Sequence, residues 1–313
     1  MAIPPPADGS AVRVGDSPII TPGMLPGRHG ENINGPSVIA MPAWATARLG
    51  RFHMYFAHHR GERIRLAHAD HPEGPWTVHP AGSLAIADLP GGHDHVASPD
   101  VHVDDAARRI IMYVHAPAAS GGDGGAFGSQ VTFAAESEDG LRFIARPGAL
   151  APFYLRAFRH AGAWFAFAKG GDLYRSPDGR TRFALVGNPF TDQIDDRPHF
   201  NRSGDIRHLA VDLRDGRLTA YFSRIGDRPE RLLRRSIALG PDPAAWRAGA
   251  EEEVLRPERP WEGAGLPLAA SRAGAATGPE HALRDPAVLR LGDEAWLYYS
   301  IAGEQGLAVA RLR

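Results

Sequence analysis

Histidine stands out among the residue types of this chain that can carry acid–base or metal chemistry. The 313 residues include 15 histidines, and two of them form the triplet His93–Asp94–His95. Two imidazoles separated by one residue point to the same face of a strand, which is a pattern that can ligate a divalent metal. His93 and His95 are therefore candidate metal ligands, although they lie in a glycine-rich stretch. His115 and His208 are better candidates for proton transfer or for hydrogen bonds to a ligand.

Three carboxylates are candidate catalytic groups. Asp100 lies in SPDV (98–101) and Asp285 in RDPAV (284–288), each beside a proline and before a valine. We interpret these two positions as equivalent within the repeat described below, so we expect both carboxylates to act at one site. Glu304, in the turn AGEQG (302–306), is the third candidate. Because Asp–Pro and Pro–Asp pairs also form turns, a purely structural role is the alternative for each aspartate.

The elements that must position these residues are short strands. Helical periodicity is scarce, and five aromatic-rich runs recur roughly every 50–60 residues, with a wider last interval. They are HMYFAHH (53–59), IMYVHAP (111–117), WFAFAKG (164–170), TAYFSR (219–224) and WLYYSIA (296–302). A repeat of this length with three or four strands per unit is typical of a propeller blade, which buries its faces only against its neighbours.

The repeat predicts an all-β fold, a five-bladed β-propeller, as a single domain over residues 1–313. The blades are expected at roughly 32–80, 95–147, 152–190, 195–250 and 280–313, with an N-terminal closing strand near 12–20. The segment 241–279 is interpreted as a long excursion between the fourth and fifth blades. A β-sandwich followed by a second domain is the competing architecture.

Blade geometry predicts where the chemistry converges. In an antiparallel blade the start of the first strand, the end of the second and the start of the third lie at one face of the ring. Polar groups from several blades should therefore meet at one axial mouth, where a ligand site is expected. Besides the candidates above, this mouth should gather Ser98, Gln130 and Lys169. Substrate-binding roles are expected there for Asn34, His58, Arg156, Arg207, Arg224 and Arg284.

Two further features bear on the ligand. Four of these residues are arginines, and several guanidinium forks at one face suit a carboxylate, sulfate or phosphate on a substrate. Trp261, in PWEGAG (260–265), is a candidate platform for stacking against a sugar ring.

Three segments resemble blades of the five-bladed propeller glycosidases, the superfamily of glycoside hydrolase families 43, 32, 68, 117 and 130. They are HALRDPAVLRLGDEAWLYYSIAGEQGLAVARL (281–312), NINGPSVI (32–39) and ASPDVHV (97–103). The resemblance implies a glycosidase-like fold, with acidic residues at the first-strand starts acting on a sugar held at the axis.

Family 43 enzymes place an aspartate base in the first blade, a helper aspartate in the second and a glutamate acid in the third. Asp100 matches the helper. Asn34 stands where the resemblance implies the base, and an amide cannot act as a general base. The third-blade segment PFYLRAFRH (152–160) contains no glutamate.

Composition excludes several other classes. With 35 basic and 36 acidic residues, a net charge of -1 gives no global field to hold nucleic acid or an anionic membrane. The absence of cysteine excludes disulfides, a thiolate zinc site and a cysteine nucleophile. No apolar run is long enough to span a bilayer. No secretory signal is visible, which makes the cytoplasm the default location and leaves the compartment uncertain.

We therefore expect a glycoside hydrolase acting on an oligo- or polysaccharide, preferably an anionic one, without a required cofactor. Asp285 or Asp100 would act as the base or tune its pKa, and Glu304 or a histidine at the mouth would protonate the leaving oxygen. A non-catalytic saccharide-binding propeller is the first alternative, favoured by Asn34 and the missing glutamate. A lyase or hydrolase with a divalent metal at the axial site, held by His58, His95 and His115, is the second.

Overall fold

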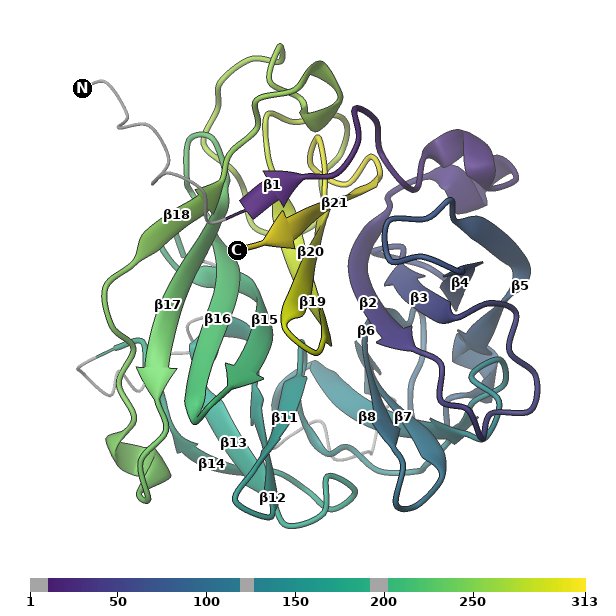
Figure 1. Cartoon of the computed structure of the whole chain (residues 1–313), viewed down its shortest axis with the longest axis vertical. Helices are drawn as coiled ribbons and strands as arrows, with labels where there is room; N and C mark the ends of the chain where they lie inside the picture. Colours follow the sequence, from purple (N-terminus) through teal and green to yellow (C-terminus); the bar gives the residue numbers. More distant parts are fainter. Residues whose placement is uncertain (1–10, 119–126, 192–201) are drawn as a thin grey trace.

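Five antiparallel sheets surround a central axis in the computed structural model (Figure 1). The structure describes residues 11–118, 127–191 and 202–313, so the expected closing strand is described only from Ala11 and the fourth blade from Arg202. The prediction of an all-β five-bladed propeller is confirmed.

The first two blades follow the chain from the axis outward. The first contains β2 (Asn34–Ala40), β3 (Phe52–Ala57), β4 (Arg63–Ala69) and β5 (Thr77–Ala85). The second contains β6 (Ala97–Asp104), β7 (Arg109–Pro117), β8 (Gln130–Ser137) and β10 (Ala151–Pro152), with β9 (Ile144–Ala145) also paired to β8.

The third and fourth blades repeat this order. The third contains β11 (Arg156–His160), β12 (Ala163–Phe167), β13 (Leu173–Ser176) and β14 (Ala184–Gly187). The fourth contains β15 (Ile206–Arg214), β16 (Arg217–Arg224), β17 (Leu232–Ala238) and β18 (Glu252–Leu255). The segment 241–279 is therefore only partly an excursion, because it supplies the outer strand β18.

The fifth blade joins the two ends of the described chain. It contains β19 (Arg284–Leu291), β20 (Glu294–Ser300), β21 (Leu307–Leu312) and, at its outer edge, β1 (Ala11–Arg13). β1 runs antiparallel to β21, with Val12 opposite Arg311. An isolated bridge between Ile20 and Leu307 adds a second connection. The ring is closed by hydrogen bonds between these distant segments (Figure 1).

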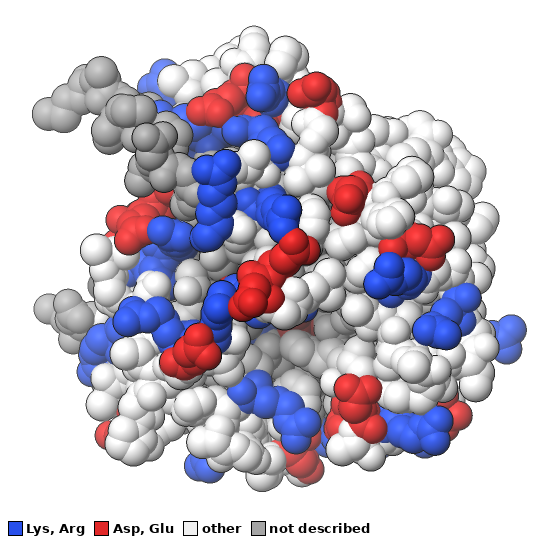
Figure 2. Space-filling view, in the orientation of Figure 1, with Lys and Arg blue, Asp and Glu red and all other residues white. Residues whose placement is uncertain are grey.

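The described ranges contain six short 3-10 helices. They are η1 (Pro22–Met24), η2 (Gly27–Gly30), η3 (Ile86–Asp88), η4 (Lys169–Gly171), η5 (Pro243–Ala245) and η6 (Pro260–Glu262). None of the helices seen in these ranges has the length and apolar character to cross a bilayer. On the face shown in Figure 2, acidic and basic side chains are interspersed.

The repeated aromatic strand is the second strand of each blade, and it is buried on both faces. In β3 and β12 every residue is buried, because each sheet packs between two neighbouring sheets. Tyrosines recur in these strands because their hydroxyls link blades. Tyr55 donates to the Gly140 carbonyl at 2.8 Å, Tyr113 to Gly179 at 2.8 Å, and Tyr298 to Pro72 at 2.8 Å. Each phenol thus satisfies its polar end in the adjoining blade while its ring fills the core.

The first strands form the hub. β2 contacts β6 and β19, and β15 contacts β11 and β19. Because all five first strands run in the same direction along the axis, their starting residues gather at one end of the hub. This is the end at which the sequence predicts the functional site.

Candidate active site at the hub

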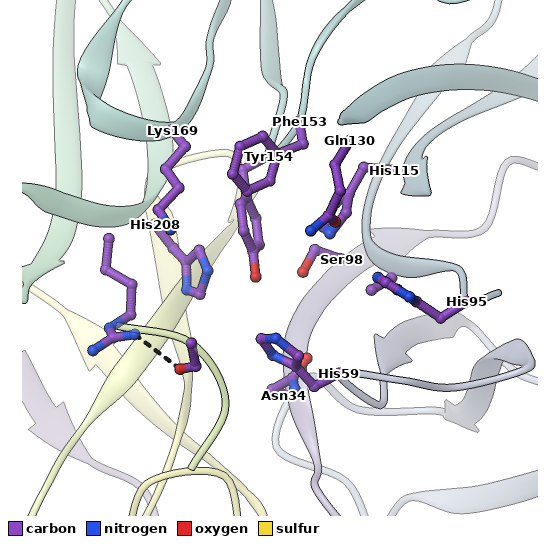
Figure 3. A pocket seen from close by; sticks show the side chains of 13 residues that line it. Asn34, His59, His95, Ser98, His115, Gln130, Phe153, Tyr154, Lys169 and His208 are labelled. Carbon is purple, nitrogen blue, oxygen red and sulfur yellow. Dashed lines mark hydrogen bonds between the residues drawn. The ribbon is translucent and has the colours of Figure 1, made fainter. Parts of the chain in front are cut away.

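A cavity of about 190 Å³, here called the hub pocket, opens where the first strands begin (Figure 3). Four blades and the segment before the fifth contribute to its wall. The lining residues are Asn34, His59, His95, Ala97, Ser98, His115, Gln130, Phe153, Tyr154, Lys169, Arg207, His208 and Gly274. Among the residues that the structure describes, neither aspartate nor glutamate lines this pocket, and the described part of its wall carries imidazole, amide, hydroxyl and cationic groups.

Three histidines of the hub pocket, His59, His115 and His208, are held neutral. Burial, followed by nearby His95 and Lys169, lowers the pKa of His59 to about 4. Burial also lowers the pKa of His115 and His208 well below the ordinary value, and neighbouring cations act in the same direction. At neutral pH these rings therefore lack a charge, and each retains one nitrogen that can accept a proton.

His208 and Asp285 form a pair at the wall of the hub pocket. The imidazole Nδ1 contacts Oδ1 of Asp285, and the Ser300 hydroxyl donates to Oδ2 of the same carboxylate at 3.1 Å. Asp285 is 1% exposed and stands behind the ring, outside the cavity. Nδ1 is the ring nitrogen that faces the carboxylate, so a proton on this atom would leave Nε2 of His208 as the proton-accepting nitrogen. The structure thus brings together two residues that the sequence analysis proposed as catalytic.

Tyr154 is a residue of the hub pocket that the sequence analysis missed. Its ring centroid lies 3.9 Å from that of His208 and 4.4 Å from that of His115, so it fills the space between them (Figure 3). Its backbone is left-handed, with φ 61°, a conformation that costs about 1–3 kcal/mol in a non-glycine residue. Burial raises its pKa to about 12. The signal available in the sequence is its place just before the third blade's first strand, the segment in which the resemblance implies a glutamate.

Lys169 enters the hub pocket from η4, directly after the second strand of the third blade. Its Nζ lies 5.3 Å from the centre of the Phe153 ring and 5.8 Å from that of Tyr154. Burial, with a further contribution from Arg207, lowers the pKa of Lys169 to about 8.

A buried network of ions underlies the hub pocket. Arg207 reaches the cavity, but its Nε donates to Glu230 at 2.7 Å and its terminal nitrogens donate to the carbonyls of Arg272 and Gly274. Arg284 is 1% exposed and forms ion pairs with Glu230 at 2.9 Å, with Glu304 at 3.5 Å and with Glu280. Arg284 therefore neutralises carboxylates below the pocket and does not face a ligand, contrary to expectation.

Glu304 belongs to the same network. It is 1% exposed, accepts a hydrogen bond from Asn32 Nδ2 and another from the backbone of Ala276 at 3.3 Å, and does not line the hub pocket. Its expected role as an acid on the substrate is therefore not supported by its position. Asn34 does line the pocket and donates to Asn32 at 2.7 Å.

Asp100 occupies a different cavity. A space of about 260 Å³, here called the lower hub cavity, is lined by residues farther along the first strands, including Asp100, His102, Arg156, Asp212 and Arg290. The Asp100 carboxylate accepts from the Ala157 backbone at 2.7 Å and contacts His102 Nε2 at 2.8 Å. Although burial opposes ionisation, His102, Arg156 and the Ala157 N–H together lower the pKa of Asp100.

The strand register explains why the two aspartates separate. Ala97 pairs with His115 and Asp100 with Tyr113, whereas Arg284 pairs with Ser300 and Ala287 with Tyr298. Asp100 is thus equivalent to Ala287, and Asp285 to Ser98, two residues earlier. The expectation that both carboxylates face one small molecule is wrong. By the same register Asn34 is equivalent to Ala97, not to Asp285.

The remaining predicted residues scatter around the rim or the outside. His58 lines rim cavities beside Arg60, and Arg156 lies in the lower hub cavity, donating to the Leu209 carbonyl at 3.1 Å. Arg224 pairs with Glu251, and Trp261 is half-buried against the core between the last two blades. Neither of these two lines the hub pocket.

The two candidate metal ligands also separate. His95 lines the hub pocket with its Nδ1 2.8 Å from Asp94, whereas His93 is exposed beside the Pro117 carbonyl at 3.0 Å. Within the three described ranges, no three histidine or acidic side chains are arranged to hold a metal ion.

Comparison with known proteins gives one relative by sequence. No family model matches the chain. It is 33% identical over 303 residues to the uncharacterised protein R118 of Acanthamoeba polyphaga mimivirus, covering 90% of this chain and 83% of that protein.

Solved structures show the fold. The GH43_1 enzyme from Xanthomonas citri, also solved with xylotriose, has a TM-score of 0.62 at 14% identity over 97% of this chain and 92% of its own. CoXyl43, a GH43 β-xylosidase/α-arabinofuranosidase from a compost metagenome, has a TM-score of 0.61 at 12% identity over 97% and 95%. The resemblance stated from the sequence is thus confirmed as a likeness of fold.

Proposed function

We propose that this chain, which belongs to the family of the mimivirus protein R118, hydrolyses a glycosidic bond of an anionic saccharide in the hub pocket. The chain has the fold of family 43 glycoside hydrolases. The fold supports a saccharide substrate, because structural neighbours include xylosidases and were solved with xylotriose or xylose. The activity itself is inferred from the pocket.

The His208–Asp285 pair is the observation that carries this proposal. A neutral imidazole at the wall of a cavity can accept a proton from water, and a buried carboxylate behind it fixes the tautomer and stabilises the imidazolium that forms. Ser300 holds the second carboxylate oxygen, so the pair is oriented from behind. In this assignment His208 activates the attacking water, and Asp285 is a positioning residue.

The charge of the hub pocket supports an anionic substrate. Lys169 and Arg207 contribute positive charge to its described wall, and burial holds His59, His115 and His208 neutral. A carboxylate or sulfate on the sugar would offset these cations, and the amides of Asn34 and Gln130 would provide donors for it.

Assay of the purified chain on a matched panel tests this function. The panel contains glucuronate-bearing and sulfated oligosaccharides, with xylotriose as the neutral comparison, and new reducing ends are counted. We expect cleavage of an acidic member, and loss of cleavage in His208→Gln. Release of an unsaturated uronate would instead indicate elimination, and cleavage of xylotriose alone would refute the anionic class.

A non-catalytic saccharide-binding role is the second candidate. The observation in its favour is that none of the described lining residues of the hub pocket is a carboxylate, whereas two carboxyl groups normally act in glycoside hydrolysis. Calorimetric binding of an acidic oligosaccharide with no turnover, unchanged in Asp285→Asn, would select this role.

A further inference from the structure

We infer that Lys169 is the proton donor of the hub pocket and protonates the oxygen of the departing sugar. This inference rests on the proposed hydrolysis. That proposal assigns His208 as the base, and Lys169 would supply the acid that the reaction also needs. Four observations support it: the uniqueness of the residue, its location, its surroundings and the charge that the reaction develops.

Lys169 is the single lysine of the chain, against 34 arginines. The scarcity of lysine does not by itself explain where the remaining one is placed. It lies in the wall of the hub pocket, 5% exposed, in the same cavity as His208 (Figure 3). Arginine stays protonated in proteins, whereas an amine can lose its proton, so this position is suited to a titrating cation.

The surroundings make the ammonium a ready donor. The rings of Phe153 and Tyr154 face Nζ and keep water away from it. With its pKa lowered to about 8, the group is protonated at neutral pH and gives up its proton more easily than an ordinary lysine. Among the described residues, Arg207 lowers the pKa of Lys169 and Asp205 raises it. The other titratable groups described near it are the neutral rings of His59, His115 and His208, the Tyr154 phenol, and Asp172 at the end of η4.

The reaction itself favours lysine over arginine. Glycoside hydrolysis passes through a transition state with positive charge on the sugar ring. The proton moves from Nζ to the glycosidic oxygen, the anomeric C–O bond breaks with its electron pair on that oxygen, and water attacks the anomeric carbon while losing a proton to His208. Lys169 becomes neutral as the sugar becomes positive, so the two charges do not oppose each other. A permanently charged guanidinium would oppose the developing cation.

The single lysine makes the titration directly measurable. Protein labelled with ¹³C at lysine Cε gives one lysine side-chain signal, whose shift is followed against pH. We expect a midpoint near 8, as the burial of Lys169 indicates. Arg217→Lys, at an exposed position of β16, adds a reference lysine that should titrate near the ordinary value of about 10.4. If both lysines titrate together, the inference is wrong, whatever the activity of the chain.

Kinetics of Lys169→Arg test the role. The variant keeps the charge but cannot donate the proton, so kcat on oligosaccharides should fall at least about 10²-fold with little change in KM. With a para-nitrophenyl glycoside the leaving group needs no proton, so the loss should be much smaller. Lys169→Gln should show the same contrast if the arginine variant does not fold, as judged by circular dichroism.

The outcomes separate the two proposals. Unchanged kcat in a folded Lys169 variant overturns the role of Lys169 and leaves the proposed hydrolysis standing. Equal losses on both substrates show that the residue only binds or supports the pocket, which also overturns it. If the wild-type chain cleaves no member of the panel, the proposed function fails and the proton-donor role fails with it.

Discussion

The hub pocket and the lower hub cavity lie along the same first strands, yet they differ in chemistry. The described wall of the first contains histidines, Tyr154 and two cations and no carboxylate, whereas the second contains Asp100 and Asp212 paired with His102 and Arg290. In the hub pocket polar groups are left to face a ligand. In the lower cavity acidic groups are neutralised by neighbouring blades. The comparison teaches that a carboxylate at the axis is not by itself a catalytic group.

The largest expected effect separates the two aspartates by activity. Asp285→Asn should lower kcat by about 10²–10⁴-fold, because the amide no longer fixes the tautomer of His208 or stabilises its charged form. Steady-state kinetics on the cleaved acidic oligosaccharide measure it. Asp100→Asn is the matched control, and a loss of similar size in that variant would contradict the contrast between the two cavities.

The next effect concerns stability. Asp100→Asn should lower the free energy of unfolding by about 1–3 kcal/mol, because an uncharged amide replaces the buried carboxylate whose oxygen contacts His102 and accepts from the Ala157 N–H. The pKa of Asp100 is lower in the folded state than in the unfolded state. The ionised carboxylate therefore stabilises the fold fully above the unfolded pKa of about 3.9, and this stabilisation is lost as the pH falls through the folded-state pKa. Denaturant unfolding at pH 7 and pH 3 should therefore show a difference that shrinks in acid. A constant difference would refute this account.

A smaller effect is expected at the centre of the hub pocket. Tyr154→Phe keeps the ring between His208 and His115 but removes the hydroxyl that points into the cavity. Loss of one hydrogen bond, at about 0.5–1.5 kcal/mol, should raise KM roughly two- to tenfold. Tyr174→Phe, outside this pocket in the third blade, serves as the control. An unchanged KM in Tyr154→Phe would show that the phenol does not contact substrate.

A further effect concerns the pH dependence of stability. His59 has a folded pKa of about 4 against an unfolded value of about 6.5, so between these values the unfolded chain binds more protons. The free energy of unfolding should therefore fall as pH drops from 6.5 to 4. In His59→Asn this fall should be shallower, as measured by thermal unfolding over the same window. An identical slope would mean that His59 is not held neutral.

The sequence was sufficient to predict the blades but not the sites along them. The aromatic repeat is visible because each second strand is buried on both faces, and Tyr55, Tyr113 and Tyr298 must each reach a carbonyl of the next blade. Because the same requirements recur in the second strand of one blade after another, they produce a repeat that is visible in the sequence.

The error over the two aspartates came from a two-residue offset. Asp100 follows its proline and Asp285 precedes its own, so aligning Pro99 with Pro286 would have separated them. The burial of Arg284 and Glu304 could not be foreseen in this way, because Glu230, which shares their network, lies more than fifty residues earlier in the chain. Tyr154 was invisible for another reason: its importance depends on two imidazoles from different blades.

The pairing of β1 with β21 also constrains how the protein is made. During synthesis β1 (Ala11–Arg13) has no strand to pair with until Leu307–Leu312 leaves the ribosome, although the intervening blades have already emerged. Such a long separation between paired segments slows folding, because loop closure must precede the contact. The first and fourth blades must therefore wait, each with one flank open to solvent, until translation of the last blade is complete.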